Sequence, residues 1–406
     1  MRRTTTTTTT RRRRRRGERW NTYIWTYYTI VFSTFMFRWR ITKATELEFV
    51  PLRKAAENIS NFTMGAAGPV SLLYNESNVT YQNTLIQNYG LTTAENACKW
   101  ASTEPQEGTF AFSGCTAVQK FCENNKLKFR GHNLCWGKYN PAWLTSLNAS
   151  EKKLALQYHI KSIVTHYNDS AVAWDVVNEA IGDSIFVSSD VDRDLAKTDV
   201  KLRNAIANGE ELLKEDYRDS NPWGFKTSDW YPDVPNFVWI AFSAARAAAP
   251  PGVKLFYNDY AIADANSDKA KRVYALVKNL TAMGLIDGVG LQMHVQAGWE
   301  TEHGDGLSST LHMYEKLGLE VHITEMDVTN EPRDDNAQAK TYVDSLSRCV
   351  ASSICTNFET WGFTDAHTWK GTEENPLPFN TSLLPKTAAK EMSAFLQNYS
   401  KGLNVN

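Results

Sequence analysis

Two glutamates share a local setting that could support chemistry. Glu179 ends the stretch "WDVVNE" and Glu325 ends "EVHITE", so each carboxylate follows an apolar, β-prone run. Two carboxyl groups about 5.5 Å apart can cleave a glycosidic bond with retention of configuration, one as proton donor and the other as nucleophile. One group must then stay protonated and the other ionised, which burial and neighbouring charges can arrange. The pair predicts hydrolysis of a glycoside if the fold brings the two ends together.

Polar neighbours suggest how the two roles are divided. Asn178 directly precedes Glu179, and its amide could hydrogen-bond a sugar hydroxyl during the reaction, so Glu179 is predicted to be the acid/base. Glu325 would then be the nucleophile, with His294 as its hydrogen-bond partner. Asp327, two residues further along the same strand face, could hold the His294 ring. The alternative is that each Glu belongs to a structural salt bridge.

The elements that must position these residues alternate from residue 60 onward. Eight β-prone runs are expected at 62–67, 89–95, 127–136, 171–179, 253–259, 287–295, 319–328 and 357–365. Between them, stretches such as "EKKLALQYHIKSIVTHYN" repeat apolar residues every three or four positions, as on a one-faced helix. Apolar strands alternating with helices indicate parallel β-α units, and eight units predict an α/β fold, the (β/α)8 TIM barrel. A doubly wound open sheet is the alternative, but no GxGxxG follows the first strand.

Active sites of this barrel lie where the C-terminal ends of the strands meet. Polar and aromatic residues fall at the same end of seven expected strands, which favours the barrel and places Glu179 across its mouth from Glu325. The candidates are Glu95, Asn96, Lys99, His132, Trp136, Tyr257, Gln292, His294, Trp361 and Trp369. The tryptophans among them are the best candidates for stacking on sugar rings.

Composition restricts the partners. Forty-four basic and 45 acidic residues leave a net charge of -1, which gives no general electrostatic reason to expect nucleic acid. Thirteen Trp and 17 Tyr are many for 406 residues and suit sugar stacking, although a core could also use them. Cys98, Cys115, Cys122 and Cys135 crowd together without a CxxC, so zinc is not expected. No metal or cofactor is predicted.

The glycosylation sequons and the cysteines indicate the cellular compartment in which the protein is expected. Chance would give roughly four Asn-X-Ser/Thr sequons, and the excess favours a secreted glycoprotein. The sequons begin at Asn58, Asn61, Asn75, Asn78, Asn148, Asn168, Asn279, Asn380 and Asn398. Six cysteines allow many disulfide pairings. Cys349 and Cys355 are the first pair to consider, because they are close enough to close a small loop before a strand.

Residues 1–54 are expected to be a low-complexity leader. A Thr run and six Arg precede the uncharged stretch 20–37, which has the outline of a signal peptide or signal anchor. Its many Tyr, Thr and Trp residues make it a weak bilayer segment, so a non-native leader is equally open. The catalytic domain is predicted over 55–400, in a monomer that contacts a membrane only if 20–37 is a retained anchor.

Seven motifs occur in order along the chain: "TAENACKW", "RGHNLCWGKYNPAW", "WDVVNEAI", "LFYNDY", "GVGLQMHV", "ITEMDV" and "TWGFTDAHTW". From about residue 60 to 395 the chain resembles glycoside hydrolase family 10, the retaining endo-1,4-β-xylanases built on a (β/α)8 barrel. The resemblance implies that Glu179 is the acid/base, that Glu325 is the nucleophile, and that xylan is the substrate. It implies a disulfide between Cys349 and Cys355. It also implies stacking of a sugar on Tyr257 and xylose binding by the other candidates named at the strand ends.

Two departures from the family bear on specificity. Gly137 follows Trp136 where the family usually has a His, so one hydrogen bond is missing or supplied from elsewhere. The chain after Glu179 is also long, and an insertion is expected around 182–235 on the active-site face. It could wall the product-side subsites or be a solvated decoration. The alternatives for the whole protein are a family member adapted to another β-glycoside and a catalytically decayed carbohydrate-binding protein.

Overall fold

The computed structural model describes residues 48–183, 221 and 223–403. These residues belong to one compact unit that begins at Glu48. Residues 1–47 of the predicted leader therefore lie outside the described residues. Most of the predicted insertion, residues 184–220 and 222, lies outside them as well.

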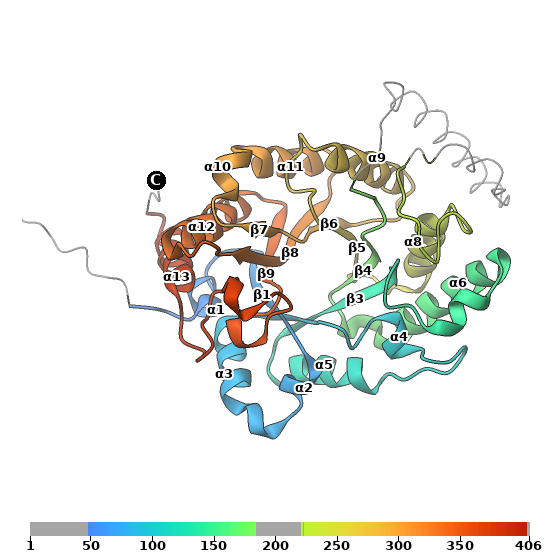
Figure 1. Ribbon diagram of the computed structural model, residues 1–406, viewed down its shortest axis with the longest axis horizontal. Helices are drawn as coiled ribbons and strands as arrows, with labels where there is room; N and C mark the ends of the chain where they lie inside the picture. The colour runs from blue at the N-terminus through green and yellow to red at the C-terminus, as the bar shows by residue number, and fades with distance from the viewer. Residues whose placement is uncertain (1–47, 184–220, 222, 404–406) are drawn as a thin grey trace, which may run out of the picture. The chain divides into compact units, whose positions relative to one another are not determined.

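Eight parallel strands close into a barrel, as predicted (Figure 1). Each strand pairs in parallel with the next, β1 pairs with β9, and the pairing of β6 with β8 completes the circle. The strands are β1 (Thr63–Gly68), β2 (Leu91–Ala94), β3 (Lys128–Trp136), β4 (Ala173–Asn178), β5 (Lys254–Asp259), β6 (Gly288–Leu291), β8 (Glu320–Thr329) and β9 (Cys355–Thr360). The short β7 (His294–Gln296) pairs with the end of β8 only.

Helices surround the strands on the outside of the barrel (Figure 1). They are α1 (Leu52–Ala55), α2 (Val70–Leu73), α3 (Val79–Asn88), α4 (Trp100–Thr103), α5 (Ser113–Asn124), α6 (Ala149–Tyr167), α8 (Phe237–Ala248), α9 (Asp268–Ala282), α10 (Trp299–His303), α11 (Gly306–Glu315), α12 (Asp335–Ala351) and α13 (Thr387–Ser400). Among the described helices, none combines the length and the hydropathy needed to cross a bilayer.

Helix α6 shows how the local sequence sets these elements. Its first turn is closed by a capping box, in which the Asn148 side chain accepts the Glu151 N–H at 3.0 Å and the Glu151 carboxylate accepts the Asn148 N–H at 2.8 Å. Leu156, Ile160 and Ile163 then recur on one face and are fully buried. The helix is therefore fixed at its start by a cap and along its length by the apolar stripe that packs on the barrel.

Two strands differ most from their expected boundaries. The run 287–295 is interrupted after Leu291, because Met293 adopts a positive φ of 60° and separates β6 from β7. The last strand ends at Thr360, ahead of Trp361. At the other end of the domain, Leu52 is completely buried and packs in the core. The barrel domain thus includes residues that were assigned to the leader.

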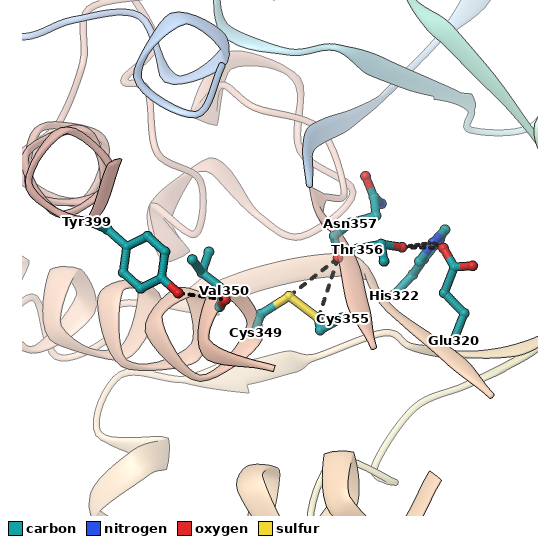
Figure 2. The surroundings of a disulfide bond; sticks show 8 residues. All are labelled: Glu320, His322, Cys349, Val350, Cys355, Thr356, Asn357 and Tyr399. Carbon is teal, nitrogen blue, oxygen red and sulfur yellow. Dashed lines mark hydrogen bonds and ion pairs between the residues drawn. A yellow bond between two sulfur atoms is a disulfide. The ribbon is translucent and has the colours of Figure 1, made fainter. Parts of the chain in front are cut away.

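Two disulfides are formed. The predicted bond between Cys349 and Cys355 joins the end of α12 to the start of β9, and Figure 2 shows it beside the Tyr399 hydroxyl of α13. A second bond joins Cys98 to Cys115, a pairing that the sequence left open. The other two cysteines of that group are buried free thiols.

One of the nine sequons is inaccessible in this fold. Asn279 lies on α9 with an exposed fraction of 2%, and its side-chain oxygen accepts the indole N–H of Trp239 at 2.7 Å. A glycan on Asn279 would break this buried contact, so this position does not support the glycosylation argument.

Candidate active site

The two glutamates, Glu179 directly after β4 and Glu325 within β8, are joined through a network of amides. Gln292 donates to Glu179 Oε1 and to the Asn178 side-chain oxygen, both at 3.2 Å. Asn258 donates to the same Asn178 oxygen at 2.9 Å and to Glu325 Oε1 at 2.6 Å. Three amides from β4, β5 and the end of β6 thus connect one carboxylate to the other.

Backbone geometry aims the two carboxylates differently. Glu179 comes directly after the last residue of β4 and has a φ of +54°, which turns the chain out of the strand at this residue. All six residues of β4 are buried, so the strand itself is anchored in the barrel. Glu325 lies within β8 and is 5% exposed. The first carboxylate stands at the start of a loop, whereas the second is held inside a strand.

His294 links Glu325 to Asp327. Its Nε2 lies 3.4 Å from Glu325 Oε2, and its Nδ1 lies 2.8 Å from Asp327 Oδ2. Burial by itself would lower the pKa of His294, but the Asp327 and Glu325 carboxylates outweigh it and raise that pKa to about 10. The ring is therefore an imidazolium at neutral pH and places a positive charge beside Glu325. Trp369 donates its indole N–H to the same Asp327 oxygen at 2.7 Å.

His132 is oriented by buried charges inside the barrel. Its Nδ1 lies 2.9 Å from Asp175 Oδ2, and Asp175 is ion-paired with Arg130. All three side chains are almost completely buried. The edge of Trp361 meets the His132 ring, with 5.0 Å between the ring centroids. His132 is thus held in one orientation at the barrel mouth.

Lys99 carries the positive charge on the β2 side of the mouth. Its Nζ donates to Asn96 at 2.7 Å and lies 4.9 Å from the centre of the Trp136 ring. Burial lowers the pKa of Lys99, and the carboxylates of Glu325, Glu95 and Glu179 oppose that shift. Burial also raises the pKa of Glu95, while Lys99 lowers it.

The stacking role expected for Tyr257 is wrong. Its ring is fully buried, its hydroxyl donates to Asp259 at 2.7 Å, and it accepts the N–H groups of Ala180 and Ile181. Tyr257 therefore braces the loop that follows Glu179. Side chains alternate between the two faces of a strand, so Tyr257 points away from the barrel interior into which its neighbour Asn258 reaches.

No catalytic or binding role was predicted for three contributors to the site: Asn258, Tyr260 and Lys226. Lys226 Nζ lies 3.5 Å from Glu179 Oε2 and donates to the Tyr260 hydroxyl at 3.1 Å. Asn258 and Tyr260 belong to the "LFYNDY" motif at a strand end, which was the available signal. Nothing in the sequence pointed to Lys226, because it lies in the predicted insertion at 182–235 and not at the end of a predicted strand.

Part of that segment also occupies the space beside Gly137. A Cβ atom on Gly137 would lie 3.0 Å from Ser228 Cβ, which is closer than ordinary contact. Two residues further on, Trp230 donates its indole N–H to the Trp136 carbonyl at 2.7 Å. The absence of a side chain at Gly137 is therefore matched to the packing of residues 228–230.

The polar groups at the mouth do not form a metal site. Across the described parts of the chain, no group of three or more His, Cys, Asp or Glu side chains is arranged to hold a metal ion. What the site offers is two carboxylates, an imidazolium, a lysine and several aromatic rings, which suits acid/base and nucleophilic chemistry on a neutral sugar.

Comparisons with known proteins agree with this architecture. A family model described as glycosyl hydrolase family 10 matches residues 52–200 and 209–394. Endo-1,4-beta-xylanase B of Neocallimastix patriciarum is 36% identical over 311 residues, which are 76% of this chain but 32% of that protein, so the chain spans about a third of this relative. Endo-1,4-beta-xylanase A of Caldicellulosiruptor saccharolyticus is 30% identical over 379 residues, covering 86% of this chain and 97% of the relative.

Solved structures show the same fold. The crystal structure of native xylanase 10B from Thermotoga maritima aligns with a TM-score of 0.72 at 27% identity, covering 87% of this chain and 100% of that one. Xylanase 10B from Thermotoga petrophila in complex with xylobiose aligns with a TM-score of 0.72 at 26% identity, covering 86% and 98%. The predicted family and the predicted (β/α)8 barrel are confirmed, and the chain belongs to glycosyl hydrolase family 10, whose members are glycoside hydrolases.

Proposed function

We propose that this protein is a secreted, monomeric endo-1,4-β-xylanase that cleaves internal β-1,4-xylosidic bonds of xylan with retention of configuration. The observation that carries the proposal is the amide network that joins Glu179 to Glu325. It is supported by the relatives named endo-1,4-beta-xylanase and by the bound xylobiose in the Thermotoga petrophila structure.

In the first step, the Glu325 carboxylate attacks the anomeric carbon while Glu179 donates its proton to the leaving oxygen. The glycosidic bond breaks and a glycosyl ester forms on Glu325. In the second step, Glu179 accepts a proton from water, the water oxygen attacks the anomeric carbon, and the ester bond to Glu325 breaks. Asn258 and the His294 imidazolium lie against Glu325 and stabilise the negative charge that it holds before the first step and regains in the second.

The other groups at the mouth are proposed to bind the xylan chain around the cleaved bond. The polar side chains would form hydrogen bonds with xylose hydroxyls. The Trp369 side chain has an exposed fraction of 59%, and its ring could stack on a sugar. These residues are Glu95, Asn96, Lys99, His132, Trp136, Asn178, Gln292, His294, Trp361 and Trp369.

The segment that ends near residue 235 is proposed to wall the product side of the cleft. Lys226 reaches Glu179, and Glu179 protonates the leaving-group oxygen, so Lys226 and Tyr260 stand where the leaving sugar would lie. Ser228 fills the space next to Gly137. These contacts favour a wall over a solvated decoration for the described end of the segment.

The test is release of reducing sugar from xylan, compared with cellulose and aryl β-glycosides, by the native protein and by Glu325→Ala. Glu179→Ala is expected to lose xylan activity yet cleave aryl xylosides whose leaving groups need no proton. Glu104→Gln is the matched control, because Glu104 is buried but pairs with His159.

Xylan hydrolysis that survives Glu325→Ala would refute the two-glutamate mechanism. Aryl-glycoside cleavage without xylan cleavage by the native protein would favour a member adapted to another β-glycoside. Binding of xylan with no hydrolysis of any of these substrates would favour a decayed carbohydrate-binding protein.

A further inference from the structure

The asparagine side chains of the nine sequons fall into two groups. Six of them are hydrogen-bonded within the protein, namely Asn75, Asn78, Asn148, Asn168, Asn279 and Asn380. In the described part of the chain, the side chains of the other three, Asn58, Asn61 and Asn398, make no hydrogen bond. All three are exposed or partly exposed. Each of these amides can therefore carry a substituent without the loss of a native contact.

The three free asparagines belong to one region of the surface. Asn58 and Asn61 line a cavity of about 280 Å³ together with Tyr399. Tyr399 is the middle residue of the third sequon, which begins at Asn398. A second cavity of about 970 Å³ adjoins the first, since Ser352 and Tyr399 line both. We call the two cavities together the base groove.

The base groove lies at the end of the barrel opposite to the catalytic groups. Its lining includes Phe62, directly before β1, and Cys355, the first residue of β9. Glu179, in contrast, directly follows the C-terminal end of β4. Because the strands of the barrel are parallel, an occupant of the base groove stays clear of the substrate cleft.

Tyr399 presents an aromatic ring between the two cavities in a fixed orientation. Its hydroxyl donates to the Val350 carbonyl at 3.2 Å, as Figure 2 shows beside the disulfide. Phe395 packs next to it, with ring centroids 5.8 Å apart. Tyr399 is nevertheless 39% exposed, and Leu403 in the same groove is 56% exposed. The groove thus offers solvent an apolar surface with a fixed ring, which suits the apolar face of a sugar.

The charges in the base groove favour a neutral occupant. Arg348 is already paired with Asp344 at 2.7 Å and with Asp305 at 3.1 Å. His312 Nδ1 lies 3.2 Å from Glu315 Oε2. Among the described residues, no charged side chain lines the smaller cavity. An acidic or basic segment of a partner would find no uncompensated charge here, whereas a sugar needs none.

We propose that N-linked glycans on Asn58, Asn61 and Asn398 cover the base groove. Sugars of these glycans stack on Tyr399. The proposal rests on the proposed secretion, since this modification belongs to secreted proteins. Glycans are favoured over a second copy of the chain or a polysaccharide, because their attachment points lie in and beside the groove itself.

The modification needs a lipid pyrophosphate-linked oligosaccharide as donor. The asparagine amide nitrogen forms a bond to the anomeric carbon of its terminal N-acetylglucosamine. The bond from that carbon to the pyrophosphate oxygen breaks, the lipid pyrophosphate leaves with the bonding electrons, and the amide nitrogen loses one proton. The remaining N–H and the amide oxygen stay in place.

The experiment secretes the full chain from a eukaryotic host behind an added signal peptide. Mass spectrometry of proteolytic peptides measures the glycan occupancy of each sequon. Thermal unfolding is then compared for the native protein and Tyr399→Ala, each before and after a peptide-N-glycosidase removes the glycans. Tyr399→Ala leaves the Asn398 sequon intact. Tyr158→Ala is the matched control, because Tyr158 is 55% exposed but lies on α6 and does not line the groove.

All three sites are expected to be occupied. Glycan removal should lower the Tm of the native protein and of Tyr158→Ala by roughly 1–3 °C and that of Tyr399→Ala by much less, because the stacking surface is gone. Asn398→Gln removes one attachment point and keeps the tyrosine, so its Tm should fall less than that of the native protein. This second variant keeps the test available if Tyr399→Ala does not fold. Xylan hydrolysis should not change on glycan removal, because the groove is remote from the cleft.

Unoccupied Asn58, Asn61 and Asn398 in the secreted protein overturn the proposal. So does an equal fall in Tm for the native protein and Tyr399→Ala, because the glycans would then not contact the groove. A dimer of the unglycosylated protein that Tyr399→Ala dissociates also overturns it and identifies a second copy as the occupant. The proposed secretion is tested separately with the chain's own N-terminus: retention inside the cells would refute secretion, and with it the glycans, whatever the occupancy behind the added signal peptide.

Discussion

Asn258→Ala should slow the second half of the reaction more than the first. Asn258 is completely buried and donates to Glu325 Oε1 at 2.6 Å. In the proposed mechanism, negative charge leaves Glu325 when the glycosyl ester forms and returns when the ester is hydrolysed, so this hydrogen bond should strengthen in the transition state of hydrolysis. A hydrogen bond to a charged group contributes about 1.5–3 kcal/mol. At about 1.4 kcal/mol per tenfold in rate, hydrolysis of the ester should slow roughly 10- to 100-fold.

The assay is stopped-flow hydrolysis of an aryl β-xylobioside with a good leaving group, for which ester hydrolysis limits turnover. A burst of phenol followed by a lowered kcat is expected, with kcat/KM reduced much less, because kcat/KM reports formation of the ester. Asn279→Ala is the control: it also removes a buried asparagine, but one whose partner is Trp239 on α8. A fall in kcat/KM equal to that in kcat, or no burst in a folded variant, would refute the role assigned to the Asn258 hydrogen bond.

Gly290→Ala should reproduce part of this defect without touching substrate, since a Cβ atom there would lie 2.2 Å from the Asn258 side-chain oxygen; a variant with native kcat would contradict it. Glu359→Gln should flatten the pH dependence of stability. Burial raises the pKa of Glu359 from 4.5 to about 8, so the folded protein holds a proton that the unfolded chain releases, and stability falls as pH rises from 4.5 through 8. Between pH 5 and pH 9 the native protein should lose at most about 4 kcal/mol of unfolding free energy through this group, which urea unfolding at the two pH values measures. The same loss in native protein and in Glu359→Gln would rule the assignment out. Gly137→His should lower the melting temperature through collision with Ser228, and Ser228→Gly in the same chain should restore it; a stable single variant would show that the loop yields.

Much of the architecture was predictable because it depends on local periodicity. Apolar runs that alternate with one-faced helices can bury both surfaces of their strands only in a parallel sheet, and eight such units close a barrel. In a barrel of parallel strands, all C-terminal ends lie at one mouth. Glu179 and Glu325, each following an apolar run, could therefore be assigned to a common site before any contact was known.

Side-chain direction at a strand end was harder to predict. Tyr257 and Asn258 are adjacent in one motif, yet Tyr257 braces a loop and Asn258 holds Glu325. The sequence pattern identifies which residues lie at the strand end. The register of the strand decides which face of the sheet each side chain points to, and a shift by one residue exchanges the two faces.

The sequence by itself determined the barrel, the family and the two carboxylates, because each follows from periodicity or from residues that are close along the chain. Tertiary structure alone decided that Lys226 meets Glu179, that Ser228 fills the space beside Gly137, and that Cys98 pairs with Cys115. The convergence of Asn58, Asn61 and Tyr399 on one cavity was equally invisible in the sequence. The contacts of Lys226 with Glu179 and of Ser228 beside Gly137 join segments that are far apart along the chain, and the relative position of such segments is set by the packing of the whole barrel and not by local residue preference.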